Sequence, residues 1–227
     1  YQIGALNLWC DEDITALAVK GVLQTGFPEF PSGAIYFRSL LTTYLTSLSV
    51  AVFGFSELTL RLPSLFFSLA TIFLLFVFSK RLFSRHVGLL AAAILTFSYW
   101  DIEFARHARM YEALAFFFLF ALYSAYRGLV LDQKRWLFRS FALSFAALFV
   151  HILGVVLSAV YFALLFIRPK NKTCTLQLLS ASAALAMMAA VLYVLIDFGF
   201  ANPNAQFRVA YLQKFTTTQN FVPPDAG

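Results

Sequence analysis

Three consecutive acidic residues, Asp11, Glu12 and Asp13, stand near the start of a chain in which 61% of the residues are hydrophobic. At the beginning of a helix a carboxylate can cap free amides and interact favourably with the helix dipole, although one acid is enough for that role. An ionised carboxylate can also take a proton from an incoming hydroxyl or amine. Adjacent carboxylates are, in addition, ligands for Mg²⁺, Mn²⁺ or Ca²⁺. The triplet by itself leaves a structural role, a general base and a metal site open.

Charged residues gather again in the segment WDIEFARHARMYE, residues 100–112. Arg106 and Arg109 are three positions apart, and if a helix continues through them they share a face, where two guanidinium groups can hold a phosphate. The same arginines could instead reach toward lipid headgroups, balanced by Glu103 and Glu112. The segment is therefore a candidate phosphate site with a simpler membrane-surface alternative.

Three further side chains are candidates for the same region. Arg38, close to Tyr36 in the sequence, is either another contact for an anion or a solvated arginine. His151 stands in the middle of an apolar segment, where an ionisable residue usually faces a cavity or hydrogen-bonds within the bundle. We expect His151 and Tyr111 to lie beside a substrate cavity.

The elements that must position these residues are membrane helices. Only 12% of the residues are charged and 28 are phenylalanine, against roughly 25% charged residues in an average soluble domain. Several apolar runs approach the ~20 residues that a helix needs to cross a bilayer. We predict spans at about 61–79, 87–104, 112–131 and 176–198. The predicted fold is an all-α, polytopic bundle of transmembrane helices.

The distribution of basic residues predicts the side of the membrane on which each connection lies. Ten of the seventeen Lys and Arg residues fall in three short connections, which the positive-inside rule places in the cytoplasm. Because the second and third connections then lie on the same side, segment 140–167 must enter the membrane and return as two short helices, with His151 and Gly154 near the turn. The ten residues are Lys80, Arg81, Arg85, Arg127, Lys134, Arg135, Arg139, Arg168, Lys170 and Lys172.

This topology divides the chain into three parts. Residues 1–60 form an external loop, residues 61–199 form the bundle, and residues 200–227 form an external loop or a truncated tail. Within the loop, an apolar helical stripe (Ile14, Leu17, Ala18, Val22) ends at Gly26 and Pro28. Segment 35–53 has polar residues at helical spacing that leave one wet face, typical of a helix lying at the membrane interface, although a spanning helix is the alternative. Those polar residues are Ser39, Thr42, Thr43, Thr46 and Ser49.

The order of the motifs resembles one family. An acidic pair before an amphipathic helix is followed by GFPEFPSGAIYFR, FGFSELTLRLPS and IEFARHARMY. This order is similar to that of polytopic glycosyltransferases of the C superfold, in the group of protein O-mannosyltransferases and lipid A aminoarabinose transferases. The resemblance runs from about Trp9 to Phe166. Many members have PPL in the first loop, where this sequence has PSGAIYFR, so the acceptor is left open.

The resemblance implies juxtamembrane helices in the first loop, and a transmembrane helix ahead of the acidic pair that this chain lacks. It implies sugar transfer, with inversion, from a polyprenyl-phosphate carrier on the external or lumenal face to a protein, lipid or glycan. Asp11 would be the catalytic base with Glu12 beside it, while Arg106 and Arg109 would hold the carrier phosphate.

We add Arg38 to the phosphate contacts and assign Asp13 to the helix cap. The expected partners are the lipid-linked donor, the acceptor and membrane lipids, without nucleic acid. The expected location is the plasma membrane, with the active site on the external face. We expect no cofactor, because cations placed near the leaving phosphate can stabilise its charge without a metal. The alternatives to an enzyme are a transporter or flippase and a noncatalytic assembly subunit.

Overall fold

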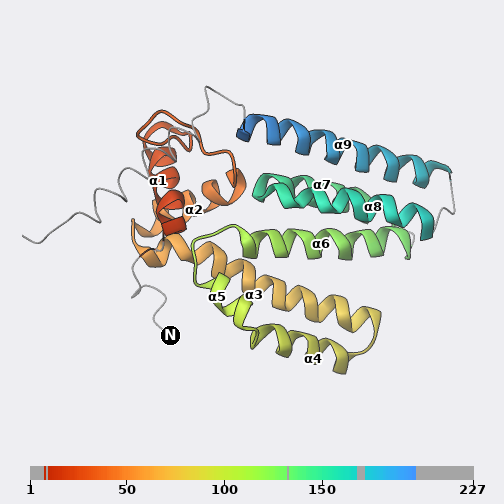
Figure 1. Cartoon of the computed structure of the whole chain (residues 1–227). Coiled ribbons are helices and arrows are strands. Elements are labelled where there is room, and N and C mark those ends of the chain that lie inside the picture. The colour runs from red at the N-terminus through yellow and green to blue at the C-terminus, as the bar shows by residue number, and fades with distance from the viewer. Residues whose placement is uncertain (1–7, 9, 132, 168–171, 198–227) are drawn as a thin grey trace, which may run out of the picture.

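The computed structural model describes residue 8 and residues 10–131, 133–167 and 172–197, and the predicted tail from about 200 lies outside them. The described part is all-α, as predicted, and contains no strand beyond a single bridge between Glu29 and Ile35. Long helices run side by side, and two short helices, α1 and α2, lie across one end (Figure 1). The helices are α1 (Cys10–Thr25), α2 (Leu40–Phe53), α3 (Glu57–Leu82), α4 (Arg85–Thr96), α5 (Tyr99–Ala105), α6 (Tyr111–Leu129), α7 (Lys134–Val150), the 3-10 turn η1 (Ile152–Val155), α8 (Val156–Ile167) and α9 (Lys172–Asp197).

Helix α3 shows how local sequence joins two elements. Ser56 caps it by accepting a hydrogen bond from the Thr59 amide at 3.2 Å, and the Thr59 hydroxyl accepts one from the Ser56 amide at 3.0 Å. Pro63 has no amide hydrogen, so the Thr59 carbonyl four residues earlier lacks its usual helical donor. The Ser49 hydroxyl of α2 donates to that carbonyl at 2.8 Å. Because Pro63 leaves the Thr59 carbonyl free, the hydrogen bond from Ser49 can join α2 to α3.

Two of the predicted spans, 61–79 and 112–131, correspond to α3 and α6, both long and apolar enough to cross a membrane. The predicted span 87–104 corresponds to α4 and α5, which are together long and apolar enough to cross a membrane but have a bend of 60° between them. The bend brings Asp101 to α3, where the Ser68 hydroxyl donates to its carboxylate at 2.9 Å. Without it, a straight helix would carry an acidic side chain toward lipid, which is costly.

Helices α7 and α8 form an antiparallel pair, and the predicted break near His151 and Gly154 is present. Gly154 lies so close to α7 that an added Cβ would come within 2.7 Å of the Ala147 backbone. Inside the bundle, the buried Tyr161 hydroxyl lies 2.6 Å from the hydroxyls of both Ser140 and Ser144. The fourth predicted span, 176–198, lies within α9, which begins four residues earlier, except for residue 198, which is outside the described residues.

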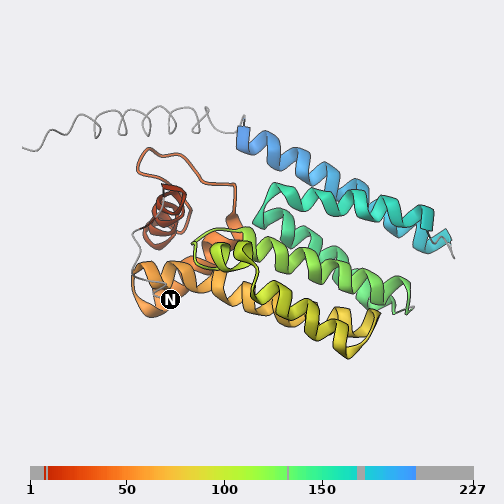
Figure 2. The ribbon, with the colours of Figure 1, turned by 60° about the horizontal axis from the view of Figure 1, so that its bottom comes forward.

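The two ends of the bundle differ in composition. The connections α3–α4 and α6–α7 lie at the same end as the start of α9, whereas α1, α2 and the segment 106–110 lie at the other end (Figures 1 and 2). Seven of the ten basic positions are in the helix ends that adjoin these two connections. Arg168 and Lys170 are outside the described residues. The fold thus places the described basic residues of these connections and the acidic triplet at opposite ends of the bundle.

The wet face predicted for segment 35–53 is wrong. Helix α2 buries its polar residues against the protein, including Ser39, Thr42, Thr43 and Thr46, and exposes Leu48, Val52 and Phe53. With 14 residues it is about 21 Å long, too short to cross a hydrocarbon core of about 30 Å. Helix α1 ends before Gly26, as predicted, and this glycine has a φ of +83°.

Candidate active site

Glu12 is the buried attachment point of α1. Its carboxylate accepts hydrogen bonds from Arg61 Nε at 2.9 Å and Arg61 Nη2 at 2.8 Å, and its Oε1 also accepts from the Ala108 amide at 2.6 Å. The two side chains are 0% and 2% exposed. One carboxylate therefore holds α1, α3 and the segment before α6 together. We call Glu12 and Arg61 the inner pair.

Asp11, the neighbouring residue, has a different partner and a different environment. Arg109 Nη2 lies 3.2 Å from Asp11 Oδ2, and Arg109 Nη1 donates to the Asp11 carbonyl at 2.9 Å. The Asp11 side chain is 52% exposed, whereas that of Arg109 is 12% exposed. We call Asp11 and Arg109 the outer pair. Asp13 is exposed in the first turn of α1. It lies inside the helix and not at the residue before it, so the prediction that Asp13 is the helix cap is wrong.

The expected helical face shared by Arg106 and Arg109 is absent, because α5 ends at Ala105 and α6 begins at Tyr111. The intervening segment turns through a backbone hydrogen bond from the Arg109 amide to the His107 carbonyl at 2.8 Å. This turn directs the Arg109 guanidinium toward α1.

The acids expected to balance these arginines have other surroundings. Glu103 lies 3.9 Å from His107, measured from Oε1 to Nε2, and its carbonyl lies 2.7 Å from His107 Nδ1. Glu112 is buried in the first turn of α6.

A group of basic and aromatic side chains lies beside the outer pair. The Tyr111 ring has the Arg109 guanidinium 5.8 Å from its centroid on one side and the His151 ring centroid at 6.3 Å. His151 lies between α7 and η1, outside both candidate spans, and its Nδ1 accepts from the Leu153 amide at 3.1 Å. Burial lowers the pKa of His151, and the positive charges of Arg38 and Arg109 lower it further. The positive charges of Arg38 and Arg109 thus both act on His151.

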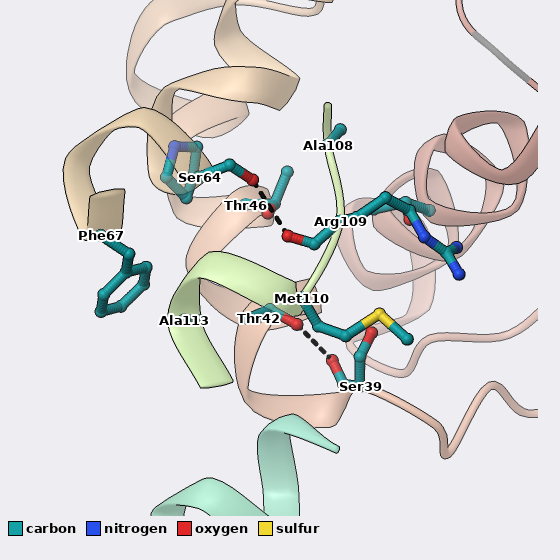
Figure 3. A pocket seen from close by; sticks show the side chains of 11 residues that line it. Ser39, Thr42, Thr46, Ser64, Phe67, Ala108, Arg109, Met110 and Ala113 are labelled. Carbon is teal, nitrogen blue, oxygen red and sulfur yellow. Dashed lines mark hydrogen bonds between the residues drawn. The ribbon is translucent and has the colours of Figure 1, made fainter. Parts of the chain in front are cut away.

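A small cavity next to this group is lined by both hydroxyl-bearing and apolar residues (Figure 3). Its volume is about 10 Å³, which is roughly the space for one water molecule. The Ser64 hydroxyl donates to the Arg109 carbonyl at 3.0 Å across it, and the Arg109 guanidinium points away from it toward α1. His151 and Tyr111, which we expected beside a substrate cavity, do not line this one. Its lining includes Thr15, Ser39, Thr42, Thr46, Ser64 and Arg109.

Sequence reasoning did not assign roles to Arg61, Ser64 and Asp101. The sequence does single out Arg61 as a candidate for a buried ion pair, since it is a charged residue at the start of an otherwise apolar run and belongs to the RLPS motif. Among the residues that the structure describes, no three His, Cys, Asp or Glu side chains gather as a metal site would require.

A comparison with protein families identifies the family of the chain. The family model of dolichyl-phosphate-mannose-protein mannosyltransferases matches residues 38–196, well over half of the sequence, and the chain belongs to this family. It is therefore a membrane glycosyltransferase of the mannosyltransferase type, which favours the enzyme over the transporter and the assembly subunit. The matched range includes Arg61, Arg109 and His151 but not the acidic triplet. No curated protein and no solved structure matches the chain.

Proposed function

We propose that this enzyme transfers a sugar from a polyprenyl-phosphate donor to a hydroxyl or amine acceptor at the end of the bundle that carries the outer pair. The observation that supports the proposal is the meeting of Asp11 and Arg109, 98 residues apart in the chain and joined at 2.9 Å and 3.2 Å. A candidate base and a candidate phosphate contact are thereby placed in one site.

The step needs a proton acceptor and a cationic site for the leaving group. The acceptor oxygen or nitrogen forms a bond to the anomeric carbon while the bond from that carbon to the phosphate oxygen breaks, and its electron pair leaves with the phosphate. Asp11, half exposed at the start of α1, takes the acceptor's proton. Arg109, with Arg38 and Arg106 as further contacts, stabilises the departing phosphate. Attack on the face opposite the phosphate inverts the anomeric centre.

Glu12 supports this step without touching the substrate. Its carboxylate is fully buried and already accepts hydrogen bonds from Arg61 and the Ala108 amide. We assign it a positioning role, in which it fixes α1 and thereby the place of Asp11.

The test is sugar transfer by the full chain in detergent or lipid nanodiscs, with a polyprenyl-phosphate-linked sugar as donor. Asp11→Asn should lower kcat by about 10²–10⁴-fold, the usual contribution of a general base. Asp13→Asn is the matched control and should keep the wild-type rate, because its side chain is exposed in the same turn of α1. A normal rate in Asp11→Asn would refute the assignment of the base, and NMR of the product anomer would test inversion.

We also propose that the site faces the outside of the plasma membrane. The described basic connections lie at the opposite end of the bundle, and such connections are usually cytoplasmic. Cys10 begins α1 and Cys174 lies in the first turn of α9, at opposite ends. An impermeant thiol reagent should label Cys10 in intact cells and Cys174 only after permeabilisation, and the reverse pattern would overturn this orientation.

A further inference from the structure

We infer that the phosphate of the lipid donor displaces Asp11 from Arg109, so that donor binding itself frees the base. The inference rests on the proposed function and adds an order of events to it: Asp11 is held in an ion pair when the donor is absent and becomes available when the donor is present.

Arg109 already uses two of its three nitrogens to bind Asp11. Nη1 and Nη2 both bind Asp11, the first through the carbonyl and the second through the carboxylate. The third nitrogen, Nε, is buried and has no hydrogen-bond partner among the described residues. The planar guanidinium is well suited to bind phosphate through paired donors, and one residue, Asp11, now lies against both of its terminal nitrogens.

The two acids of α1 differ in the free energy that it costs them to lose their arginine partner. Asp11 is 52% exposed and can exchange Arg109 for water, because a partly exposed ion pair contributes little net free energy. Glu12 is 0% exposed and has no such exchange available, because its charge would remain buried without a partner. An incoming anion therefore competes with Asp11 and leaves the inner pair intact.

Positive charge near the outer pair also favours the binding of an anion. Arg38 is exposed, and both Arg38 and Arg109 act on His151, which lies beside Tyr111. Asp11 forms its ion pair with Arg109. Arg38 and Arg109 both add positive charge around His151, and this charge favours an anion in the region. Once released, Asp11 keeps its charge beside the donor and can accept a proton.

The test measures binding of a polyprenyl monophosphate, the released carrier, in detergent micelles by isothermal titration calorimetry, so that no turnover is needed. Asp11→Asn should tighten binding by up to roughly fivefold, the factor that corresponds to losing a competing ion pair of about 1 kcal/mol. In an Arg109→Gln background, Asp11→Asn should leave the affinity unchanged. Asp13→Asn is the matched control for loss of one negative charge in the same turn.

The outcomes separate the two proposals. If wild-type protein does not bind the polyprenyl monophosphate, the proposed function fails. If it binds and Asp11→Asn binds equally well, the exchange is refuted while the proposed function stands. If Asp11→Asn tightens binding equally with and without Arg109, the effect is general repulsion and the exchange is again refuted. Thermal unfolding checks the fold of each variant; should Arg109→Gln fail to fold, Arg109→Lys replaces it, and the effect of Asp11→Asn should then be at most half, on a logarithmic scale, of that in wild type.

Discussion

The inner and outer pairs use neighbouring acids of one helical turn and behave in opposite ways. Successive residues of an α-helix point about 100° apart, so Glu12 faces the protein while Asp11 stays at the surface. The side chains of Glu12 and Arg61 are 0% and 2% exposed, and the Glu12 carboxylate accepts hydrogen bonds from Arg61 and the Ala108 amide, whereas the Asp11 side chain is 52% exposed. The comparison shows how one turn can supply both a rigid attachment and a group free to react.

The largest difference between the pairs is expected in stability. Glu12→Gln leaves Arg61 charged and buried, and removing one partner of a buried pair costs about 3–5 kcal/mol. Asp11→Asn should cost less than about 1 kcal/mol, because its charge is partly exposed. Thermal or denaturant unfolding in detergent measures both. Equal losses in the two variants would show that the pairs do not differ.

Exchanging arginine for lysine tests the geometry of the pairs with the charge kept. Arg61→Lys loses one of two parallel hydrogen bonds to Glu12 and should lower the free energy of unfolding by about 2 kcal/mol. Arg109→Lys is the matched change in the outer pair and should lower it by less than about 1 kcal/mol. A wild-type stability for Arg61→Lys would mean that the inner pair depends on charge alone.

A smaller effect is expected from pH near the outer pair. Because burial and the two arginines lower the pKa of His151 in the folded protein, the unfolded chain takes up this proton more readily. The stability contribution is therefore complete above about pH 6.5, the unfolded value, and is lost as the pH falls through the lower folded pKa. His151→Gln should remove this part of the decline in unfolding temperature between about pH 7 and pH 5. His86→Gln, exposed at the far end of the bundle, is the control and should keep it.

The smallest effect is expected from salt. Raising NaCl from about 0.05 M to about 0.5 M screens exposed charges but hardly affects buried ones. The difference in stability between wild type and Asp11→Asn should shrink toward zero, while that between wild type and Glu12→Gln should persist. A salt-independent outer pair would contradict its description as partly exposed.

The sequence predicts the long helices α3, α6 and α9, the end of α1 and the break between α7 and α8, because apolar runs and breakers such as Gly26 and Gly154 act locally. It fails on the face of α2 that is buried. Thr43 and Ser47 satisfy their hydroxyls by donating to the carbonyls of Ser39 and Thr43 at 2.9 Å and 2.8 Å. Such hydroxyls need no water, so they can face the protein and leave apolar side chains outside.

The candidate site is only partly predictable for a different reason. Asp11 and Arg109 are recognisable by type and by resemblance, but the contacts of Glu12 join residues 49 and 96 positions away. No local pattern reveals such pairs, and the end of α5 before Arg106 separates two arginines that look like neighbours on a helix. The roles of these residues could be predicted, while their partners required the fold.

The hydrogen bond from the Ala108 amide to Glu12 also bears on how fast Arg109 can change its partner. It fixes the backbone next to Arg109, and Ser64 holds the Arg109 carbonyl at 3.0 Å. The Asp11 carboxylate, which is 52% exposed, can then leave Arg109 by rotation of its own side chain, and exposed side chains change rotamer within picoseconds to nanoseconds. Enzymes of ordinary speed turn over about 1–10³ times per second, so this exchange would be complete long before each sugar is transferred.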